Sequence, residues 1–362
     1  MRVLLAPDCF GGTLTAVEAA EAMAAGWRAA RPGDDLVLRP LSDGGPGFLD
    51  VMPGVLHELT VEDPLARPVP AAFRLDGTTA YVESAQACGL HLLAAQERDP
   101  TTTTTYGVGQ LVRAAAGAGA ARVVLGLGGS ATNDGGAGML AALGVRREDA
   151  AGERLAPGGL ALARAARLVG APYPVVLVAA TDVDAPLLGP HGASRAFGPQ
   201  KGASPEEVLA LEAALEHWAD LLEAHVGVRV RDLAGAGSAG GLGAAVLALG
   251  GTRVPGVELV AEAVGLADAV RGADLVVTGE GAFDFSSLRG KVVSGVAAWA
   301  AEHARPCLVL AGRVSVGRRQ AAAAGIEASY SLEAEVGPER ALAHAAESLA
   351  TLAEGVARQW SV

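Results

Sequence analysis

The stretch Val123-Val-Leu-Gly-Leu-Gly-Gly-Ser-Ala-Thr-Asn-Asp-Gly-Gly136 decides the fold class. It begins with an apolar run typical of a buried strand, and a helix is expected directly after it, over about 138–143. Glycine lets the backbone approach a ligand closely, and a helix N-terminus attracts anions. The stretch therefore predicts an α/β protein with a phosphate-binding loop at this position. A plain tight turn between strand and helix is the alternative interpretation.

The same alternation of apolar strands and amphipathic helices extends along the whole chain. Helices are expected after the capping boxes that begin at Thr15 and Ser204. The remaining expected elements are strands over 3–6, 36–41, 175–180, 275–277 and 307–310, a β-ribbon over 57–84, and helices over 292–305 and 338–359.

Acidic residues follow several of these strands, at the edge where ligands bind in open α/β sheets. Carboxylates at such an edge could hold Mg²⁺ and orient an attacking hydroxyl group, as phosphoryl transfer requires. Some of them are expected to be turn formers or helix caps instead. The acidic candidates are Asp8, Asp43, Asp134, Asp182, Asp184, Glu280 and Asp284.

Two lysines stand out among the 28 Lys and Arg residues. Lys201 and Lys291 are the only lysines, and each lies in a glycine-rich segment. Either could supply a positive charge for a phosphate or carboxylate, and a solvated surface lysine is the alternative.

Two glycine patterns suggest other nucleotide sites. Gly235-Ala-Gly-Ser-Ala-Gly240 matches the dinucleotide pattern G-x-G-x-x-G, which keeps an NAD(P)-dependent oxidoreductase open as an alternative. No expected strand carrying a ribose-binding acid follows it. Gly290-Lys291 lacks the upstream glycine of a Walker A loop, because position 285 is Phe.

Composition excludes several classes of protein. The net charge of −12 over 362 residues argues against a nucleic-acid partner. The three cysteines, Cys9, Cys88 and Cys307, are too few and too scattered for a disulfide framework or a zinc site. No leader or long apolar stretch is visible, so we expect a cytoplasmic protein without a membrane partner. It could be a monomer or a homodimer.

Taken together, these segments resemble the bacterial type I glycerate kinases. The resemblance implies ATP- and Mg²⁺-dependent phosphorylation of D-glycerate, a small hydroxy acid, with 2-phosphoglycerate favoured over 3-phosphoglycerate. The matching segments, in the order of the family, are 6–15, 42–45, 103–109, 126–138, 182–186, 198–202, 235–243 and 279–291.

The resemblance also implies a two-domain fold. A flavodoxin-like α/β domain is expected from residues 1–75 together with 275–362, and a second mixed α/β domain from 76–274. The site is expected in the cleft between them.

Residue roles follow from the motifs and the resemblance together. We expect Asp182 and Asp184 to hold the metal. The expected catalytic residues are Asp8, Asp43, Asp284 and Lys291. The residues expected to bind ATP are Gly128, Gly129, Ser130, Thr132, Asn133, Asp134, Gly135, Lys201 and Glu280.

Three loops depart from the family pattern. Gly11 and Ala282 stand where the family commonly has Lys and Arg, and Gly45-Pro-Gly-Phe48 replaces Gly-Glu-Gly-Thr. The acceptor could therefore be a related hydroxy acid, or the chain could be a non-catalytic ligand-binding relative. Arg289 or Arg313 could restore the missing positive charge.

Overall fold

The computed structural model describes residues 1–288 and 291–360, in which two compact units are present. The first consists of Met1–Asp43, Asp50–Met52 and Val257–Val362, and the second of Gly44–Leu49 and Pro53–Gly256. The expected boundary at residue 75 differs from this division. Strands β3 (Val55–Glu62) and β4 (Pro68–Asp76) belong to the second unit because they pair, antiparallel, in the sheet of β5 (Thr79–Glu83).

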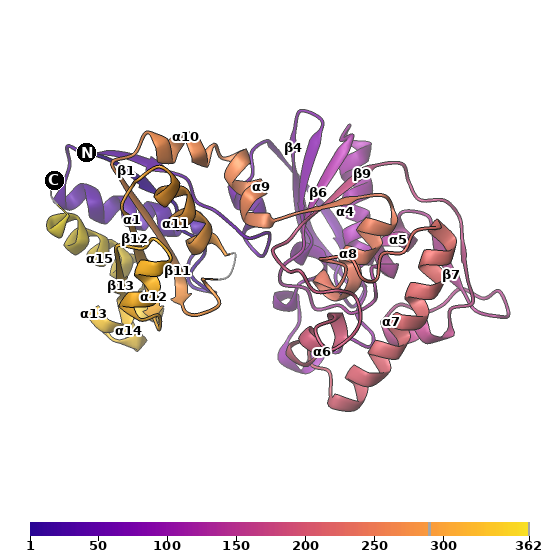
Figure 1. The fold of residues 1–362 in the computed structure, drawn as a ribbon. Coiled ribbons are helices and arrows are strands. Elements are labelled where there is room, and N and C mark those ends of the chain that lie inside the picture. The colour runs from indigo at the N-terminus through magenta and orange to yellow at the C-terminus, as the bar shows by residue number, and fades with distance from the viewer. Residues whose placement is uncertain (289–290, 361–362) are drawn as a thin grey trace. The chain divides into compact units, whose positions relative to one another are not determined.

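A parallel sheet forms the centre of the first unit (Figure 1). Within the described residues it has five strands in the order β13-β12-β11-β1-β2, and every pairing is parallel. Counted within the unit, this is the 2-1-3-4-5 order of flavodoxin-like sheets. Its strands are β1 (Arg2–Leu5), β2 (Asp35–Leu38), β11 (Leu275–Phe283), β12 (Cys307–Val314) and β13 (Ala328–Ser331).

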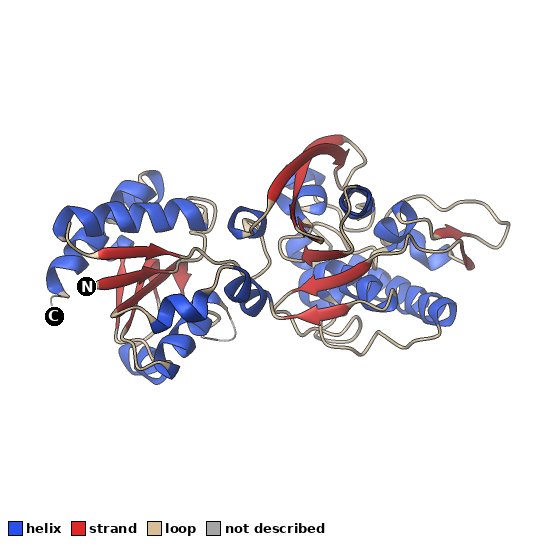
Figure 2. Cartoon of the chain, turned by 90° about the horizontal axis from the view of Figure 1, so that it is seen from above, coloured by secondary structure: helices blue, strands red, loops and turns tan. Residues whose placement is uncertain are grey.

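Helices cover both sides of this sheet (Figure 2). Helices α1 and α15 pack on each other, and residues such as Val3 and Leu5 form one buried cluster with Trp27 and Leu349. Helix α11 packs against β11 and β12. The helices of this unit are α1 (Ala16–Ala30), α9 (Gly256–Ala263), α10 (Leu266–Arg271), α11 (Val292–Glu302), α12 (Arg318–Ala323), α13 (Leu332–Val336), α14 (Pro338–Ala343) and α15 (Ala345–Gln359). Helix α2 (Phe48–Val51) is divided between the units, since Phe48 and Leu49 belong to the second.

A mixed sheet forms the centre of the second unit. Its order is β10-β9-β6-β5-β4-β3 within the described residues; β5, β6, β9 and β10 run parallel, and the β3–β4–β5 ribbon is antiparallel. The further strands are β6 (Arg122–Gly126), β9 (Val176–Ala180) and β10 (Thr252–Val254), and a separate hairpin joins β7 (Arg146–Glu148) to β8 (Arg167–Val169).

The helices of the second unit pack on this sheet around a core that includes Leu111, Met139, Trp218 and Leu242. The α-helices are α3 (Ala85–Cys88), α4 (Tyr106–Gly117), α5 (Ala137–Ala142), α6 (Ala193–Phe197), α7 (Pro205–Val226) and α8 (Ser238–Ala248). The 3₁₀ helices are η1 (Leu90–Leu92), η2 (Ala95–Glu97), η3 (Leu160–Arg164) and η4 (Pro199–Lys201).

Local signals predicted several of these elements correctly. Both capping boxes are present, with Thr15 accepting from the amide of Glu18 and Ser204 from that of Glu207. Several predictions were wrong in extent: the strand expected over 36–41 ends at residue 38, and the one expected over 307–310 continues to residue 314. The strand expected over 275–277 continues to residue 283, because it pairs with β12 along that length. The helix expected over 338–359 is interrupted at His344, which has non-helical backbone angles.

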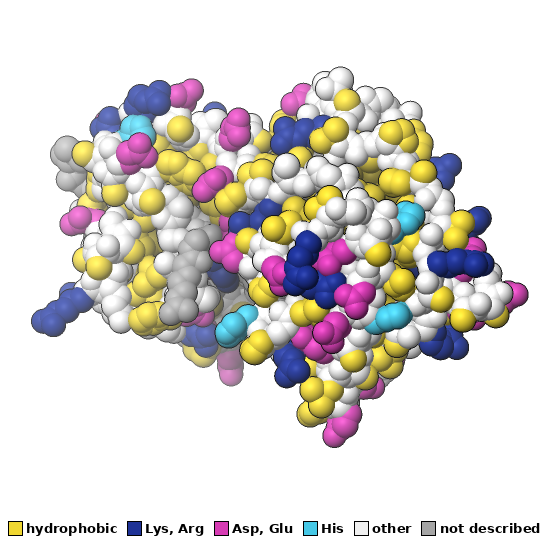
Figure 3. All heavy atoms as spheres, turned by 45° about the vertical axis from the view of Figure 1, so that its right-hand side comes forward, with side chains coloured by type: hydrophobic (Ala, Val, Ile, Leu, Met, Phe, Trp, Pro, Cys, Tyr) yellow, Lys and Arg dark blue, Asp and Glu magenta, His cyan; other side chains and the backbone are white. Residues whose placement is uncertain are grey.

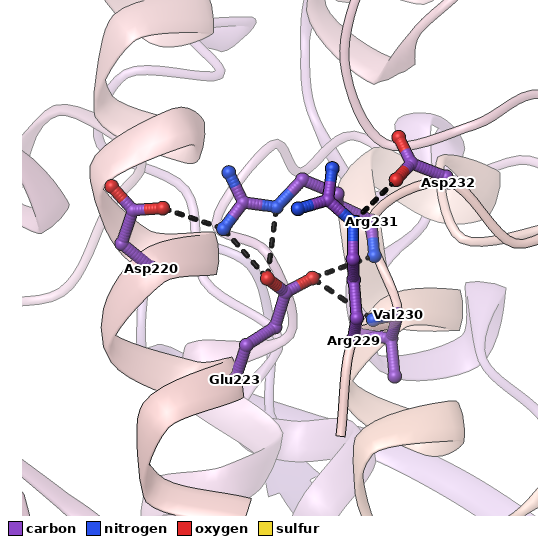
Figure 4. Close-up of polar contacts among 6 residues, drawn as sticks. All are labelled: Asp220, Glu223, Arg229, Val230, Arg231 and Asp232. Carbon is purple, nitrogen blue, oxygen red and sulfur yellow. Dashed lines mark hydrogen bonds and ion pairs between the residues drawn. The ribbon is translucent and has the colours of Figure 1, made fainter. Parts of the chain in front are cut away.

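A carboxylate–guanidinium network holds the segment after α7 against the C-terminal end of that helix (Figure 4). Glu223 accepts hydrogen bonds from the amides of Val230 and Arg231, both at 2.9 Å, and from the Arg231 guanidinium. Arg231 also pairs with Asp220. The segment after the helix is therefore held to it by one acid that binds both backbone and side chain.

The surface mixes charges of both signs. On the face drawn in Figure 3, Lys and Arg side chains lie beside Asp and Glu side chains. Within the part of the chain that the structure describes, no helix combines the length and apolar character needed to cross a bilayer.

Candidate active site

Strands β1 and β11 are neighbours whose onward connections run to opposite edges of the first unit's sheet. In open α/β sheets, ligands bind outside the carboxyl ends of the strands at such a switch point. The chain beyond β1 stays attached to β11, because the amide of Asp8 donates to the carbonyl of Gly279 at 2.8 Å. Thr278 Oγ1 also donates to the carbonyl of Ala6 at 2.7 Å. Asp8 is thus fixed at the carboxyl end of β1.

Three carboxylates of the first unit interact at this position. Burial is the main cause that raises the pKa of Asp8 to about 7, followed by the charge of Asp43 and, more weakly, that of Glu280. The amide of Cys9 donates to Asp8 Oδ1 at 2.7 Å and opposes the rise. A carboxyl group that titrates near neutral pH beside other acids is typical of a functional site.

Glu280 completes this acidic group. It was expected to bind ATP, and it lies in β11 with 8% of its surface exposed. Burial raises its pKa to about 7, and the charges of Asp284 and Asp43 add to the rise. Its Oε1 atom is buried and has no hydrogen-bond partner in the described part of the chain. Such an acceptor can bind a donor group of a ligand.

Asp284 and Lys291 lie beyond the end of β11. Asp284 forms a turn, since its Oδ1 accepts from both the amide and the hydroxyl group of Ser286 at 2.7 Å; these hydrogen bonds lower the pKa of Asp284. Lys291 precedes helix α11, and its positive charge opposes the rise in the pKa of Glu280. Lys291 thus brings a positive charge close to Glu280, one member of this acidic group. Arg289, the other cation expected nearby, lies outside the described residues.

In the second unit the parallel strands β5, β6 and β9 end level with each other. Glu83, Gly126 and Ala180 are register partners, so the segments that follow them begin at one edge of the sheet. The carboxylate of Glu83 accepts from the amides of Gly47 and Leu49, both at 3.1 Å. That bond pair holds the 44–49 segment against the same edge.

The glycines of the 126–136 loop make room for neighbouring backbone and rings. A Cβ atom at Gly128 would lie 2.3 Å from the Cα of Gly45, and one at Gly129 would lie 2.8 Å from Pro46. Gly135 has a φ of +60° and packs on Trp218, whose Nε1 donates to its carbonyl at 3.0 Å. Only Gly128 and Gly129 reach the surface of this loop, because residues 130–136 are buried.

Asp134 organises the loop from inside. It is fully buried, and it accepts from the amides of Thr105, Gly136 and Gly138 at 2.9, 3.1 and 3.0 Å and from the Thr105 hydroxyl. The Thr105 hydroxyl in turn accepts from the amide of Met139 at 3.0 Å. Asp134 therefore fixes the start of α5, and its oxygens are occupied by protein donors.

Lys201 brings a buried cation to the same loop. Its Nζ donates to Ser130 Oγ at 3.0 Å and to the carbonyl of Thr132 at 2.7 Å, and only 2% of the residue is exposed. Burial lowers the pKa of Lys201 to about 8. The ammonium group thus joins η4 to the exposed end of the glycine loop.

Asn133 and Thr132 retain unused polar atoms. Asn133 Nδ2 donates to Ser194 Oγ at 3.0 Å, whereas Asn133 Oδ1 and Thr132 Oγ1 are buried without a partner among the described residues. The sequence contained no indication of a role in the site for Ser194, and it placed Trp218 only on the apolar face of a helix. A signal for Thr105 was present in the sequence, because five successive threonines at 101–105 are unusual. The structure buries four of the five.

The expected metal residues follow β9. Asp182 is half-buried, and Asp184 is 76% exposed and forms an ion pair with Arg253 at 2.6 Å. In the described residues no group of three or more His, Cys, Asp or Glu side chains is arranged to hold a metal. These two acids lie in the second unit, whereas Asp8, Asp43 and Glu280 lie in the first.

The G-x-G-x-x-G segment has a packing role. A Cβ at Gly237 would lie 2.2 Å from the carbonyl of Pro186, and one at Gly240 would lie 1.9 Å from that of Thr132. Gly240 also accepts from the amide of Gly135 at 3.0 Å. The glycines thus allow the 235–241 segment to lie against the loop that follows β6, and this accounts for the pattern without a dinucleotide.

Comparison with known proteins gives consistent matches over the whole chain. The model of the Glycerate kinase family matches residues 3–361. The glycerate kinase of Bacillus subtilis (strain 168) is 42% identical over 99% of this chain and 97% of its own length. The glycerate 2-kinase of Escherichia coli (strain K12) is 39% identical over 93% of this chain and 92% of its own.

A solved structure matches as well. A crystal structure from Salmonella typhimurium LT2, provisionally named glycerate kinase 2, has a TM-score of 0.84 and 38% sequence identity to this chain. The match covers 99% of this chain and 98% of that one. The likeness therefore extends over both units rather than over a single motif.

Proposed function

The chain belongs to the glycerate kinase family of enzymes, and from that membership we propose that it transfers the γ-phosphoryl group of ATP to D-glycerate, with 2-phosphoglycerate as product. The name of the relative from Escherichia coli, a glycerate 2-kinase, supports the choice of the 2-hydroxyl group. We assign the acceptor to the first unit and the nucleotide to the second.

One observation carries the assignment of the acceptor. Asp8 lies at the carboxyl end of β1, at the sheet's switch point, and its pKa is raised to about 7 chiefly by burial. A carboxylate with a pKa near the working pH can accept a hydroxyl proton and release it again. Asp43 supplies a second acceptor for hydroxyl groups of the same ligand, and the unpartnered Oε1 of Glu280 a third.

The chemistry then requires little beyond positioning and charge. The acceptor oxygen forms a bond to the γ-phosphorus while the bond from that phosphorus to the bridging oxygen of ADP breaks. The hydroxyl proton moves to the Asp8 carboxylate. Lys291 offsets the negative charge of this acidic group, since it already lowers the pKa of Glu280 against the effect of burial.

Arg313 is the residue that we assign to the carboxylate of the acceptor. It is the register partner of Ala282 in the neighbouring parallel strand, so the two side chains leave the sheet on the same face. It is also exposed. The positive charge that the family commonly has at position 282 can therefore come from β12 in this chain.

On the second unit, we assign the phosphates of ATP to the exposed backbone of Gly129 and to the hydroxyl of Ser130, because the amide of Gly128 already donates to the carbonyl of Gly44 at 3.0 Å. Lys201 holds that end of the loop in place through Ser130 and Thr132. Because Asp134 is occupied by protein donors, its role is to support the loop rather than to touch the nucleotide.

The loop after β9 fits a magnesium ion by its donor chemistry. Mg²⁺ prefers carboxylate oxygens and commonly takes only one or two from the protein. Asp182 and Asp184 would supply them, since the ion pair of Asp184 is exposed and easily exchanged. When bound, the ion would neutralise charge on the transferring phosphates.

The decisive experiment is a product assay on the full-length protein. Incubation with ATP, Mg²⁺ and D-glycerate should release ADP and give 2-phosphoglycerate, identified by ³¹P NMR against authentic 2- and 3-phosphoglycerate. ADP release no faster than without acceptor would reject glycerate as substrate. Formation of 3-phosphoglycerate would reject the choice of hydroxyl group alone.

A related hydroxy acid is the second candidate acceptor. Gly11 is exposed with open space around it, so the first loop offers room and no positive charge where the family commonly has Lys. A panel of two- to five-carbon hydroxy acids, with ADP release as the readout, distinguishes the two candidates. Faster turnover of another acid than of D-glycerate at equal concentration would favour this second assignment.

A further inference from the structure

A pocket of about 290 Å³ lies in the second unit, and none of its lining residues belongs to the 126–136 loop or to the 182–184 segment. It is lined by the end of β3, the residues around the start of α4, one side of α5, and the β7 strand with the loop after it. The lining residues that matter here are Glu62, Thr104, Tyr106, Arg147 and Arg154. Neither the comparisons nor the proposed reaction uses this pocket.

Arg147 is the unusual member of the lining. Only 6% of the residue is exposed, and a single nitrogen, Nη2, has a partner, the carbonyl of Ala156 at 3.1 Å. The Nε and Nη1 atoms are buried without a hydrogen-bond partner in the described part of the chain. A buried guanidinium with unused donors is unfavourable unless an acceptor reaches it.

A second arginine faces the same space. Burial lowers the pKa of Arg147, and the positive charge of Arg154 lowers it further, whereas the negative charge of Asp134 opposes the change. Arg154 is exposed and lines the pocket. Two guanidinium groups close enough to repel each other form a natural site for an oxyanion, which accepts from both in fork geometry.

Glu62 and a tyrosine hydroxyl group narrow the ligand class. Glu62 is held by Gln110, whose Nε2 donates to its Oε1 at 3.3 Å and whose Oε1 accepts from its amide at 2.7 Å. A carboxylate at this place disfavours a bare anion and favours a ligand that also donates a hydrogen bond. Tyr106 can serve a hydroxyl group of such a ligand, whereas the Thr104 hydroxyl donates to Asp134 Oδ2 at 3.4 Å and accepts from the amide of Tyr106 at 3.3 Å.

We propose that this pocket binds a small hydroxylated oxyanion, with its phosphate or carboxylate group on Arg147 and Arg154 and a hydroxyl group on Glu62. The volume is suited to a metabolite of a few carbon atoms rather than to a nucleotide. The site does not depend on the proposed reaction.

The test uses calorimetry on the full-length protein with glycerol 1-phosphate, inorganic phosphate and lactate as probes. Tighter binding of glycerol 1-phosphate than of lactate identifies the ligand group as phosphate, and the reverse order identifies a carboxylate. Inorganic phosphate, which lacks a carbon-bound hydroxyl, should bind more weakly than glycerol 1-phosphate.

Three variants locate the binding. Arg147→Met and Arg154→Met should each weaken binding of the preferred probe by about tenfold or more, the loss expected for one charge-assisted contact. Arg146→Met is the matched control, since Arg146 is the exposed neighbour on the same strand, and it should leave affinity unchanged. Arg154 is exposed, so its variant keeps the test valid if Arg147→Met does not fold.

Binding that survives both Arg147→Met and Arg154→Met would overturn the proposal. The proposal would also fail if none of the three probes bound the unaltered chain at about 10 mM, a concentration above the dissociation constants usual for metabolites. The assay measures binding and not turnover. Loss of kinase activity and loss of ligand binding in this pocket can therefore be told apart.

Discussion

Lys201 Nζ donates to the carbonyl oxygen of Thr132 at 2.7 Å, across 69 residues of sequence. The same ammonium group donates to Ser130 Oγ. One buried cation therefore connects η4 to the glycine loop that follows β6. The long-range bond makes the shape of that loop depend on a distant part of the chain.

Lys201→Met should destabilise the protein by about 2 kcal/mol, because it leaves the buried Ser130 hydroxyl and Thr132 carbonyl without their charged donor. It should also weaken binding of Mg-ATP, since the loop is no longer held. Urea unfolding and nucleotide titration measure the two effects. Arg195→Met, a change at a partly exposed cation on nearby α6 whose ion pair with Glu212 is long at 3.7 Å, serves as the control and should alter neither. If Lys201→Met were as stable as the unaltered protein, Lys201 would not be needed to order the 126–136 loop.

Asp8→Asn should abolish most turnover and yet stabilise the fold at pH 8. The pKa of Asp8 is raised from 3.8 to about 7 in the folded protein, chiefly by burial. The folded state therefore holds this proton more tightly, so the group's contribution to stability is present below pH 3.8 and is lost as pH rises through 7. The gain from Asn should be below about 1 kcal/mol at pH 4 and about 4 kcal/mol at pH 8.

Unfolding of Asp8→Asn at several pH values tests this sign. Glu21→Gln, at an exposed position of α1, is the control and should show no pH-dependent gain. A destabilised Asp8→Asn at pH 8 would mean that the carboxylate supports the fold.

Glu280→Gln should shift the acidic limb of the pH–rate profile to lower pH. The charge of Glu280 contributes to the raised pKa of Asp8, although burial and Asp43 contribute more. In the unaltered enzyme, kcat/KM should rise between about pH 6 and 8 as the coupled acids lose their protons. The variant should begin this rise at lower pH. If the acidic limb of the profile stays at the same pH in Glu280→Gln, the charge of Glu280 does not influence the group whose titration controls turnover.

Arg313→Ala should raise the KM for D-glycerate by about tenfold or more while changing the KM for ATP little, because a charge-assisted contact to the carboxylate is lost. Arg318→Ala, at an exposed position of α12, provides the comparison. Steady-state kinetics with each substrate varied in turn give the two constants. An equal rise in both KM values would point to a general structural defect.

Glu223→Gln should destabilise the second unit by about 1–3 kcal/mol at pH 7, since it weakens the contacts with the Arg231 guanidinium and with the amides of Val230 and Arg231. Burial alone would raise the pKa of Glu223, but the hydrogen bonds from Arg231 and Val230 outweigh it and lower the pKa to about 2. Its contribution is therefore present above pH 4.5 and is lost as pH falls toward 2.

Thermal unfolding at pH 7 and pH 3 measures this difference. The gap between Glu223→Gln and the unaltered chain should narrow at pH 3. Glu216→Gln, an exposed acid on the same helix, is the control. A gap that stays constant with pH would show that the carboxylate charge has no part in the network of Figure 4.

Several features could be predicted from the sequence because their causes are local. The capping boxes at Thr15 and Ser204 each involve residues three apart, so four letters suffice to predict both helix starts. The acids after β1 and β9 follow apolar runs, and this alone places them at strand ends. The family resemblance rested on loops whose order along the chain needed no structure.

Other features depend on contacts between distant segments. Nothing near Glu280 in the sequence indicates that β11 continues through it; pairing with β12 decides that. The glycines of the 126–136 loop read as a cradle for phosphate, yet Gly128 and Gly129 are required by the approach of Gly45 and Pro46. Asp134 was expected to face a ligand, and its burial against Thr105 reflects packing 29 residues away.

The sequence by itself therefore determined the alternation of elements, the helix starts and the family of this protein, because periodicity, capping and motif order are properties of neighbouring residues. Only the tertiary structure decided which polar groups remain available. Long-range hydrogen bonds occupy Asp134, and burial raises the pKa of Asp8. Burial also leaves two of the three Arg147 nitrogens without an acceptor among the described residues. Those effects arise from desolvation by residues far apart in the chain, so no local pattern of residue types could reveal them.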